Sequence, residues 1–308
     1  MPERTVLLHK SKGWLNALLL WLLLTSFQTV AAETAQQGSI DFSALIYSAN
    51  LANAAYLTEA EIRQLIEPKN GKLSQYHTLP ESQVSYFMVT DDAKKIHYIA
   101  VRGTSNLENT IVNISLQLTL DQRSGLRLHK GFAVAAQQIY SNLQPFLKKG
   151  YKIQTTGHSL GGAIALILAM YLDKDQYKIG QIITFGQPKV TNMSGARQLA
   201  HLNVIRVVTA LDLVPLIPPF DPLDIHNLDI YWHTGIEVLL LGDKRYSILE
   251  GINSMLRATK FTQQPLNEMN LQNHTMSFYL ELLDRDAPMH ERVPYKNRFN
   301  LFNLFGKE

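Results

Sequence analysis

Hydrophobic and polar positions along the chain follow two periods, one typical of helices and the other typical of strands. From Asp41 to Ile66 the apolar residues recur at helical spacing, and Asp41 and Thr58 are suited to cap two successive helices. The runs VSYFMVT and IHYIAVR then flank DDAKK, which predicts a β-hairpin. Farther on, strand-length runs alternate with helical patterns: YKIQTT, GAIALILAMYL, IGQIITF and NVIRVVT. This alternation predicts an α/β fold with a mostly parallel central sheet and helices on both faces.

Three later segments carry their own patterns. Apolar residues from Val112 to Leu120 alternate strictly with polar ones, which predicts an extended segment, and DQRSG after it is suited to form a turn. The run YWHTGIEVLLL (231–241) predicts a strand. In RYSILEGINSMLRATKF (245–261) the apolar residues form a helical stripe, so we expect a helix that packs on the core.

The N-terminal segment is distinct from the rest of the chain. Basic residues precede an apolar run from Trp14 to Phe27, and the small residues TVAAE follow it. This order predicts a signal peptide over residues 1–32 with cleavage after Ala32, and residues 33–40 read as a linker. We therefore expect export to the periplasm or the extracellular medium. An uncleaved N-terminal membrane anchor is the alternative.

Composition limits the class of protein. The 308 residues, 46% of them hydrophobic, suffice for one large core or two modest ones. Once residues 1–32 are set aside, 26 basic and 25 acidic residues remain, so no electrostatic footprint for nucleic acid is present. The chain contains no cysteine, which excludes disulfides and lipid attachment at a thiol.

The stretch TTGHSLGGAI places Ser159 between a predicted strand and a predicted helix. A bare G-x-S-x-G pattern arises by chance in roughly one chain of this length in twenty, and a small residue in a tight turn is its bland interpretation. The strand-to-helix position instead favours a nucleophile elbow. Gly157 and Gly161 let strand and helix approach closely, while the N–H of Leu160 at the helix start faces a developing oxyanion.

A serine hydroxyl needs a base, and in this architecture the acid and then the histidine follow the serine in the chain. Asp212 stands just beyond the predicted strand NVIRVVT and is the leading acid. Its competitors lie in a turn-forming loop and are Asp221, Asp224 and Asp229.

Two histidines remain candidates for the base. His233 lies in a predicted strand, where a histidine is more often packed, whereas His274 lies in QNHTMSFYLELL directly before a helical pattern. We favour His274 because a loop residue can project into a cleft. His158 adjoins Ser159, but successive strand side chains point to opposite faces, so we expect it to be packed rather than to act as the base.

Seven ordered motifs make residues 41–283 resemble the class 3 lipase family of α/β-hydrolases. The motifs are VRGTS, LHKGF, TGHSLGG, TFGQPKVTN, VVTALDLVPLIPP, YWHTGIEV and NHTMSFY. The resemblance implies that Ser159, Asp212 and His274 are nucleophile, acid and base. It also implies that Thr104 and Leu160 supply the oxyanion hole, with His233 at a non-catalytic strand position.

In that family a lid follows the RGT motif, which corresponds here to residues 105–127. The family lid is commonly a short helix, whereas the alternation noted above predicts an extended or hairpin-like flap. A sheet-edge strand unrelated to access is the alternative. Residues 284–308 are read as a C-terminal tail.

The resemblance implies a serine carboxylic ester hydrolase that acts on lipids, similar to triacylglycerol lipases, through an acyl-enzyme. A phospholipase A1-type enzyme, a short-chain esterase and a non-catalytic lipid-binding relative are the alternatives. We expect transient contact with a lipid–water interface, and no metal, cofactor, nucleic acid or obligate protein partner is implied.

Overall fold

The computed structural model describes a large part of the chain between residues 40 and 295. The described ranges are 40–67, 71–104, 118–218, 230–251, 253–254, 257, 267–283 and 290–295. The predicted signal peptide, residues 105–117 of the predicted flap, and the competing acids Asp221, Asp224 and Asp229 lie outside them.

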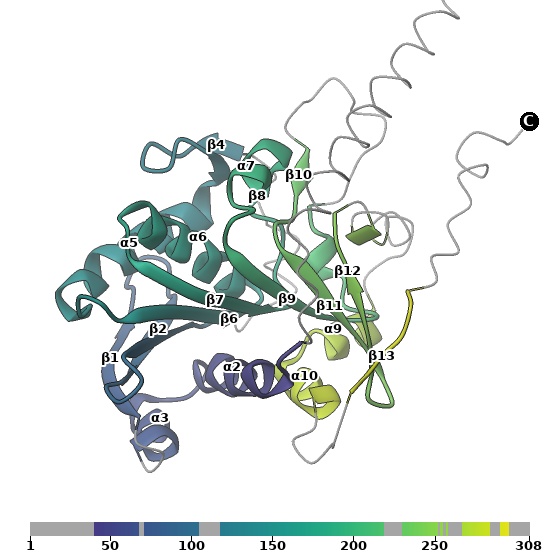
Figure 1. The fold of residues 1–308 in the computed structure, drawn as a ribbon, viewed down its shortest axis with the longest axis horizontal. Helices are drawn as coiled ribbons and strands as arrows, with labels where there is room; N and C mark the ends of the chain where they lie inside the picture. The colour runs from purple at the N-terminus through teal and green to yellow at the C-terminus, as the bar shows by residue number, and fades with distance from the viewer. Residues whose placement is uncertain are drawn as a thin grey trace, which may run out of the picture.

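A mostly parallel sheet forms the centre of the molecule (Figure 1). Its strands are Lys72–Thr78 (β1), Ser85–Asp91 (β2), Ile96–Val101 (β3), Lys152–His158 (β6), Lys178–Phe185 (β7), Asn203–Thr209 (β9), Ile236–Gly242 (β11), Arg245–Leu249 (β12) and Glu291–Arg292 (β13). Within the described part of the chain their order is β1-β2-β3-β6-β7-β9-β11-β12-β13. The neighbours from β3 to β11 pair in parallel, and antiparallel pairs flank them on both sides. The predicted fold class and the predicted hairpin of β2 and β3 are confirmed.

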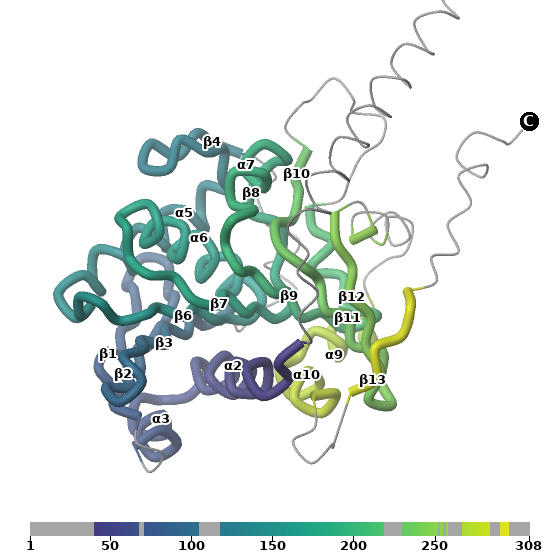
Figure 2. The backbone as a smooth tube through the Cα atoms, viewed as in Figure 1, coloured from purple at the N-terminus to yellow at the C-terminus, as the bar shows by residue number. Residues whose placement is uncertain are grey.

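Helices cover both faces of this sheet, as Figure 2 shows. The helices are Phe42–Ala54 (α2), Glu59–Ile66 (α3), Lys130–Leu143 (α5), Leu160–Lys174 (α6), Met193–Gln198 (α7), Glu268–Asn273 (α9) and Met276–Leu283 (α10), with short 3-10 turns at Gln144–Phe146 and Val214–Leu216. Helices α5 and α6 pack on one face, and α2 and α10 on the other. The predicted helix pair is confirmed, since the side chains of Asp41 and Thr58 accept hydrogen bonds from the first turns of α2 and α3.

The pleat of the strands sends successive side chains into two separate cores. In β7, Ile182 packs with the apolar residues of α5 and α6, while the next residue, Ile183, packs with those of α2 and α10. Both side chains are almost fully buried. This double burial is the reason that the parallel strands read as continuous apolar runs rather than as alternating ones.

A second, smaller sheet lies beside the central one. Its strands are Leu118–Leu120 (β4), Arg127–His129 (β5), Thr191–Asn192 (β8) and Tyr231–Trp232 (β10). Among the described residues their order is β10-β8-β5-β4, so β4 is an edge strand. Strands β4 and β5 pair as a hairpin, and the N–H of Gly125 donates to the carbonyl of Asp121 at 2.8 Å. The predicted DQRSG turn is therefore confirmed.

Two predicted elements are correct only in part, because residues 253, 254 and 257 of the expected helix are helical and the expected strand divides into β10 and β11. Residues Arg245–Leu249, predicted to begin a helix, form β12 instead, because Asp243 and Lys244 both have positive φ (48° and 57°) and turn the chain back along β11. The predicted strand over YWHTGIEVLLL is broken between β10 and β11. Gly235 has φ 72°, and a Cβ there would lie 2.3 Å from the Val204 carbonyl oxygen.

Two further observations concern the ends of the described part. Glu291–Arg292, in the predicted tail, pairs with β12 and extends the sheet. No helix among the described residues has the length and apolar character needed to cross a membrane.

A buried ion cluster joins β9 to β11. Arg206 donates to Glu237 at 3.1 Å and Arg257 donates to it at 2.7 Å, and all three side chains are at most 2% exposed. Burial alone would raise the pKa of Glu237, but Arg257 and Arg206 outweigh burial, and the pKa lies below its ordinary value. The carboxylate therefore stays charged between its two cations.

We expect Glu237→Gln to lower the free energy of unfolding at pH 7 by about 3–5 kcal/mol, because it leaves two buried guanidinium groups without a counter-charge. The pKa of Glu237 is lower in the folded state, so its contribution is complete above the unfolded value of 4.5 and is lost as the pH falls through the folded value. Urea unfolding followed by tryptophan fluorescence measures both effects. The control Glu67→Gln removes an exposed partner of Arg63 and is expected to change stability little.

Candidate active site

Ser159 occupies a strained turn between β6 and α6. Its backbone has φ 57° and ψ −131°, a conformation that non-glycine residues rarely adopt. A Cβ on Gly157 would lie 2.5 Å from the backbone of Gly161, and a Cβ on Gly161 would lie 2.2 Å from the Val101 carbonyl oxygen. The predicted close approach of strand and helix is confirmed, and it leaves the chain little room to turn in another way.

Asp212 and His274 form a buried pair beside this turn. Asp212 follows β9, and His274 lies between α9 and α10, with His274 Nδ1 and Asp212 Oδ2 separated by 2.8 Å. Asp212 is fully buried, and His274 is 2% exposed. Because a carboxylate can only accept, Nδ1 carries the imidazole proton. The other ring nitrogen, Nε2, is buried and has no hydrogen-bond partner among the described residues, so it is available to accept a proton.

The carboxylate of Asp212 is held from two further directions. The backbone N–H of Val214 donates to Oδ1 at 2.9 Å, and the Tyr279 hydroxyl donates to Oδ2 at 2.6 Å. Burial, and then the Asp212 charge, raise the pKa of Tyr279 well above its ordinary value, so the phenol remains a donor. Tyr279 was not predicted as a site residue, because nothing in its spacing distinguishes it from the other tyrosines.

Hydrogen bonds from side chains to backbone carbonyls fix the loop that carries His274. The Thr209 hydroxyl at the end of β9 donates to the Asn273 carbonyl at 2.8 Å, and the Asn270 amide donates to the Leu211 carbonyl at 2.9 Å. Gly186, at the end of β7, packs directly against the acid–base pair. A Cβ there would lie 2.7 Å from His274 Cε1 and 2.8 Å from Asp212 Oδ2.

Thr104 and Leu160 flank Ser159. Leu160 is the first residue of α6, and Thr104 follows Gly103 in the turn after β3. A Cβ on Gly103 would lie 2.6 Å from the His158 carbonyl oxygen and 3.2 Å from Ser159 Cβ, so this turn is packed on the elbow. All five predicted site residues thus lie at the carboxyl edge of the parallel strands.

The other histidines near the site make different contacts. His233 is buried, and its Nε2 donates to the Pro215 carbonyl at 2.6 Å. Burial, followed by the charges of Arg206 and Lys189, lowers the pKa of His233 well below its ordinary value. His158 is packed as predicted, with its ring 4.5 Å from that of His274.

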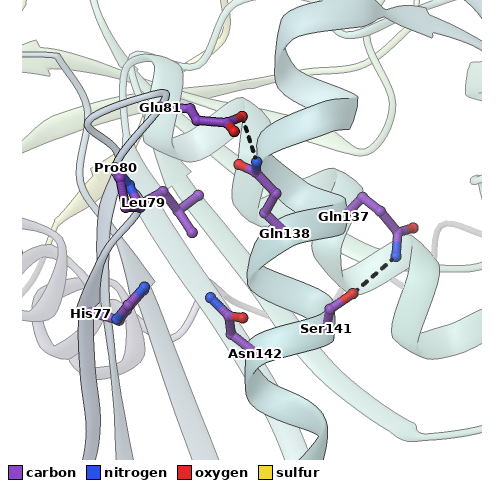
Figure 3. Close-up of a pocket in the computed structure, with 8 residues that line it drawn as sticks. All are labelled: His77, Leu79, Pro80, Glu81, Gln137, Gln138, Ser141 and Asn142. Atoms are coloured by element: carbon purple, nitrogen blue, oxygen red, sulfur yellow. Dashed lines mark hydrogen bonds between the residues drawn. The ribbon is translucent and has the colours of Figure 1, made fainter.

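A separate surface groove of about 430 Å³ lies between α5 and the turn after β1 (Figure 3). Its lining includes Glu81 and Gln138, which hydrogen-bond each other, and none of the predicted site residues. Across the described residues no cluster of three or more His, Cys, Asp or Glu side chains is arranged to hold a metal ion.

The mostly parallel sheet and the glycine-flanked elbow give this chain the α/β-hydrolase fold. A solved lipase from Rhizopus microsporus var. chinensis matches with a TM-score of 0.55 and 25% identity, over 66% of this chain and 75% of that one. Residues 98–221 match the family model described as Lipase (class 3).

Two curated relatives that the chain resembles are also named lipases. The chain is 32% identical over 176 residues to the secreted mono- and diacylglycerol lipase 1 of Fusarium solani, which covers 54% of this chain and 51% of that protein. It is 30% identical over 156 residues to a lipase of Rhizomucor miehei, covering 46% and 43%. The chain therefore spans about half the length of the curated relatives it matches.

We expect Gly186→Ala to separate Asp212 from His274, because the new methyl group would occupy space beside both side chains. The Nδ1–Oδ2 distance in a crystal structure of the variant should exceed about 3.5 Å, the limit for a hydrogen bond. Gly150→Ala is the matched control, since Gly150 has a comparable positive φ of 79° but no atom within 4 Å of the added Cβ. An unchanged pair in Gly186→Ala would contradict the packing argument.

Proposed function

We propose that the chain is a serine ester hydrolase acting on lipid esters, with Ser159 as nucleophile, Asp212 as acid and His274 as base. The observation that carries this proposal is the buried Asp212–His274 pair beside a serine in a strained elbow. Within the described part of the chain, Nε2 of His274 has no hydrogen-bond partner. Aligned nucleophile, base and acid on such an elbow are the requirements of acyl transfer.

In the proposed reaction, His274 Nε2 takes the proton of Ser159 as Oγ attacks the ester carbonyl carbon. Asp212 holds the Nδ1–H tautomer and stabilises the imidazolium that forms. The backbone N–H groups of Leu160 and Thr104 bind the oxyanion of the tetrahedral intermediate. The imidazolium then protonates the leaving alcohol, and a water molecule repeats the sequence on the acyl-enzyme to release the acid.

The substrate class rests on the relatives. The Fusarium solani protein is named a secreted mono- and diacylglycerol lipase, and the Rhizomucor miehei protein a lipase, which supports acylglycerols over phospholipids. The secreted relative also supports export of this chain, with transient contact at a lipid–water interface. A phospholipase, a short-chain esterase and a non-catalytic lipid-binding protein are outcomes that experiment can distinguish.

Ser159→Ala removes the attacking oxygen, so we expect hydrolysis of p-nitrophenyl esters to fall at least about a thousandfold while the protein stays folded. Graded acyl chains measured on the mature chain, with and without the substitution, give the test. Equal hydrolysis by both proteins would assign the activity to another site. Absence of hydrolysis by both, under varied lipid conditions, would support the non-catalytic alternative.

A panel of substrates tests which class of ester the protein hydrolyses. Triacylglycerol, diacylglycerol, phosphatidylcholine and a short soluble ester are compared at equal enzyme concentration. We expect the acylglycerols to be hydrolysed fastest. Preference for phosphatidylcholine would point to a phospholipase, and preference for the soluble ester to an esterase.

A further inference from the structure

A tyrosine from the N-terminal helix pair reaches the candidate active site. Tyr56 follows α2, and its hydroxyl lies 2.7 Å from Nδ1 of His158, the residue before the nucleophile. Nε2 of the same imidazole lies 2.6 Å from the backbone carbonyl oxygen of His274. One side chain therefore connects Tyr56 to the base loop through the nucleophile elbow.

The direction of each hydrogen bond follows from the chemistry of the groups. A carbonyl oxygen only accepts, so His158 Nε2 carries the proton that it donates to His274. Burial, and next the neighbouring His274, lower the pKa of His158 well below its ordinary value, so the ring is neutral and holds a single proton. Nδ1 is then an acceptor, and the Tyr56 hydroxyl must donate to it.

The same phenol also contacts the turn that carries Thr104. A Cβ on Gly103 would lie 2.5 Å from the Tyr56 oxygen, so the turn and the phenol are in close contact. Burial raises the pKa of Tyr56, while the backbone N–H of Gly103 opposes that rise. Tyr56 thus lies between the turn after β3 and the elbow after β6.

We infer that Tyr56 and His158 act as positioning residues. They fix the relative positions of the turn that carries Thr104, the nucleophile Ser159 and the loop that carries His274. The inference rests on the proposed ester hydrolase function. His158 and Ser159 are consecutive, so a hydrogen bond from His158 to the His274 backbone fixes the base relative to the nucleophile through very few rotatable bonds. The residue that orients His158 lies outside the segment matched by the family model, residues 98–221.

The end point of these hydrogen bonds distinguishes positioning from proton transfer. The bond from His158 ends on the main-chain carbonyl of His274, whereas the imidazole of His274 is hydrogen-bonded to Asp212. Loss of the Tyr56 hydroxyl leaves Nδ1 of His158 without a donor. The ring then has an unpaired buried acceptor and is fixed at Nε2 alone, so it can rotate and shift the loop that carries His274.

Tyr56→Phe tests the inference. We expect kcat for a soluble p-nitrophenyl ester to fall about 10- to 100-fold, the usual consequence of a displacement of about 1 Å between reacting groups, while KM changes little. The rate of phosphonylation of Ser159 by a p-nitrophenyl phosphonate should fall in parallel, because it depends on the same nucleophile, base and oxyanion turn.

Tyr171→Phe is the matched control. Tyr171 is buried in α6 and donates to Asp121 at 2.8 Å, so its substitution removes a comparable hydroxyl and hydrogen bond away from the site. We expect both variants to lose thermal stability, but only Tyr56→Phe to lose kcat. Wild-type kcat in Tyr56→Phe, or equal losses of kcat in both variants, would overturn the inference. An inactive wild-type chain would instead refute the proposed function.

Two substitutions of His158 separate its nitrogens. Glutamine places an amide N–H near the position of Nε2 and keeps the donor to His274, whereas asparagine reaches only the position of Nδ1. We expect His158→Gln to retain more activity than His158→Asn, and Tyr56→Phe to have little added effect in the His158→Gln background. The reverse order, or fully additive losses, would contradict the positioning role of Tyr56 and His158.

Discussion

The close contact between the backbones of β6 and α6 is the constraint on which the rest of the site depends. Gly157 and Gly161 approach so closely that a single added carbon on either would overlap backbone atoms. Ser159 must join them and is held at φ 57°, at a cost of order 1–3 kcal/mol. Helix α6 offsets this cost, since its residues from Gly161 to Leu172 are all buried. A helix less apolar on all sides would not hold the strand so closely.

The loops that carry Asp212 and His274 are held beside the elbow by polar side chains that donate hydrogen bonds to backbone carbonyls. Lys189 donates to the carbonyls of Leu216 and Pro218, and His233 donates to that of Pro215, so both hold the loop that follows Asp212. Burial, followed by the charges of Arg206 and Arg257, lowers the pKa of Lys189 to about 7. Such hydrogen bonds fix the path of the loop through its backbone and do not depend on the loop's side chains. The buried His233 therefore has a structural role beside the site.

The sequence predicted those features that depend on local pattern and chain order. The parallel strands, the capped helix pair and the elbow each follow from residues that are neighbours in the chain, and so does the hairpin turn at Asp121–Gly125. The failures have tertiary causes. Residues 245–249 carry a helical stripe, yet two positive φ angles before them return the chain to β11, and sheet pairing overrides the local period.

The hydrogen-bond partners of the site residues could not be predicted from the sequence. Tyr279 contacts Asp212 across 67 residues of sequence, and Tyr56 contacts His158 across 102. His158 was expected to be packed, but its two hydrogen bonds depend on α2 and on the loop after α9, which no spacing rule connects. Local pattern therefore predicted the residues that are proposed to react, and long-range folding supplied the side chains that contact them.

The contacts around His158 and His274 determine which of the two neighbouring imidazoles can carry a positive charge. The rings of His158 and His274 are 4.5 Å apart, and a positive charge on both would be strongly unfavourable in a buried site. His158 faces a carbonyl and a phenol, neither of which carries a negative charge, whereas His274 faces the carboxylate of Asp212. In the proposed reaction, a proton taken from Ser159 is therefore stabilised on His274 rather than on His158. The neutral ring of His158 can therefore hold the loop that carries His274 in place without competing for that proton.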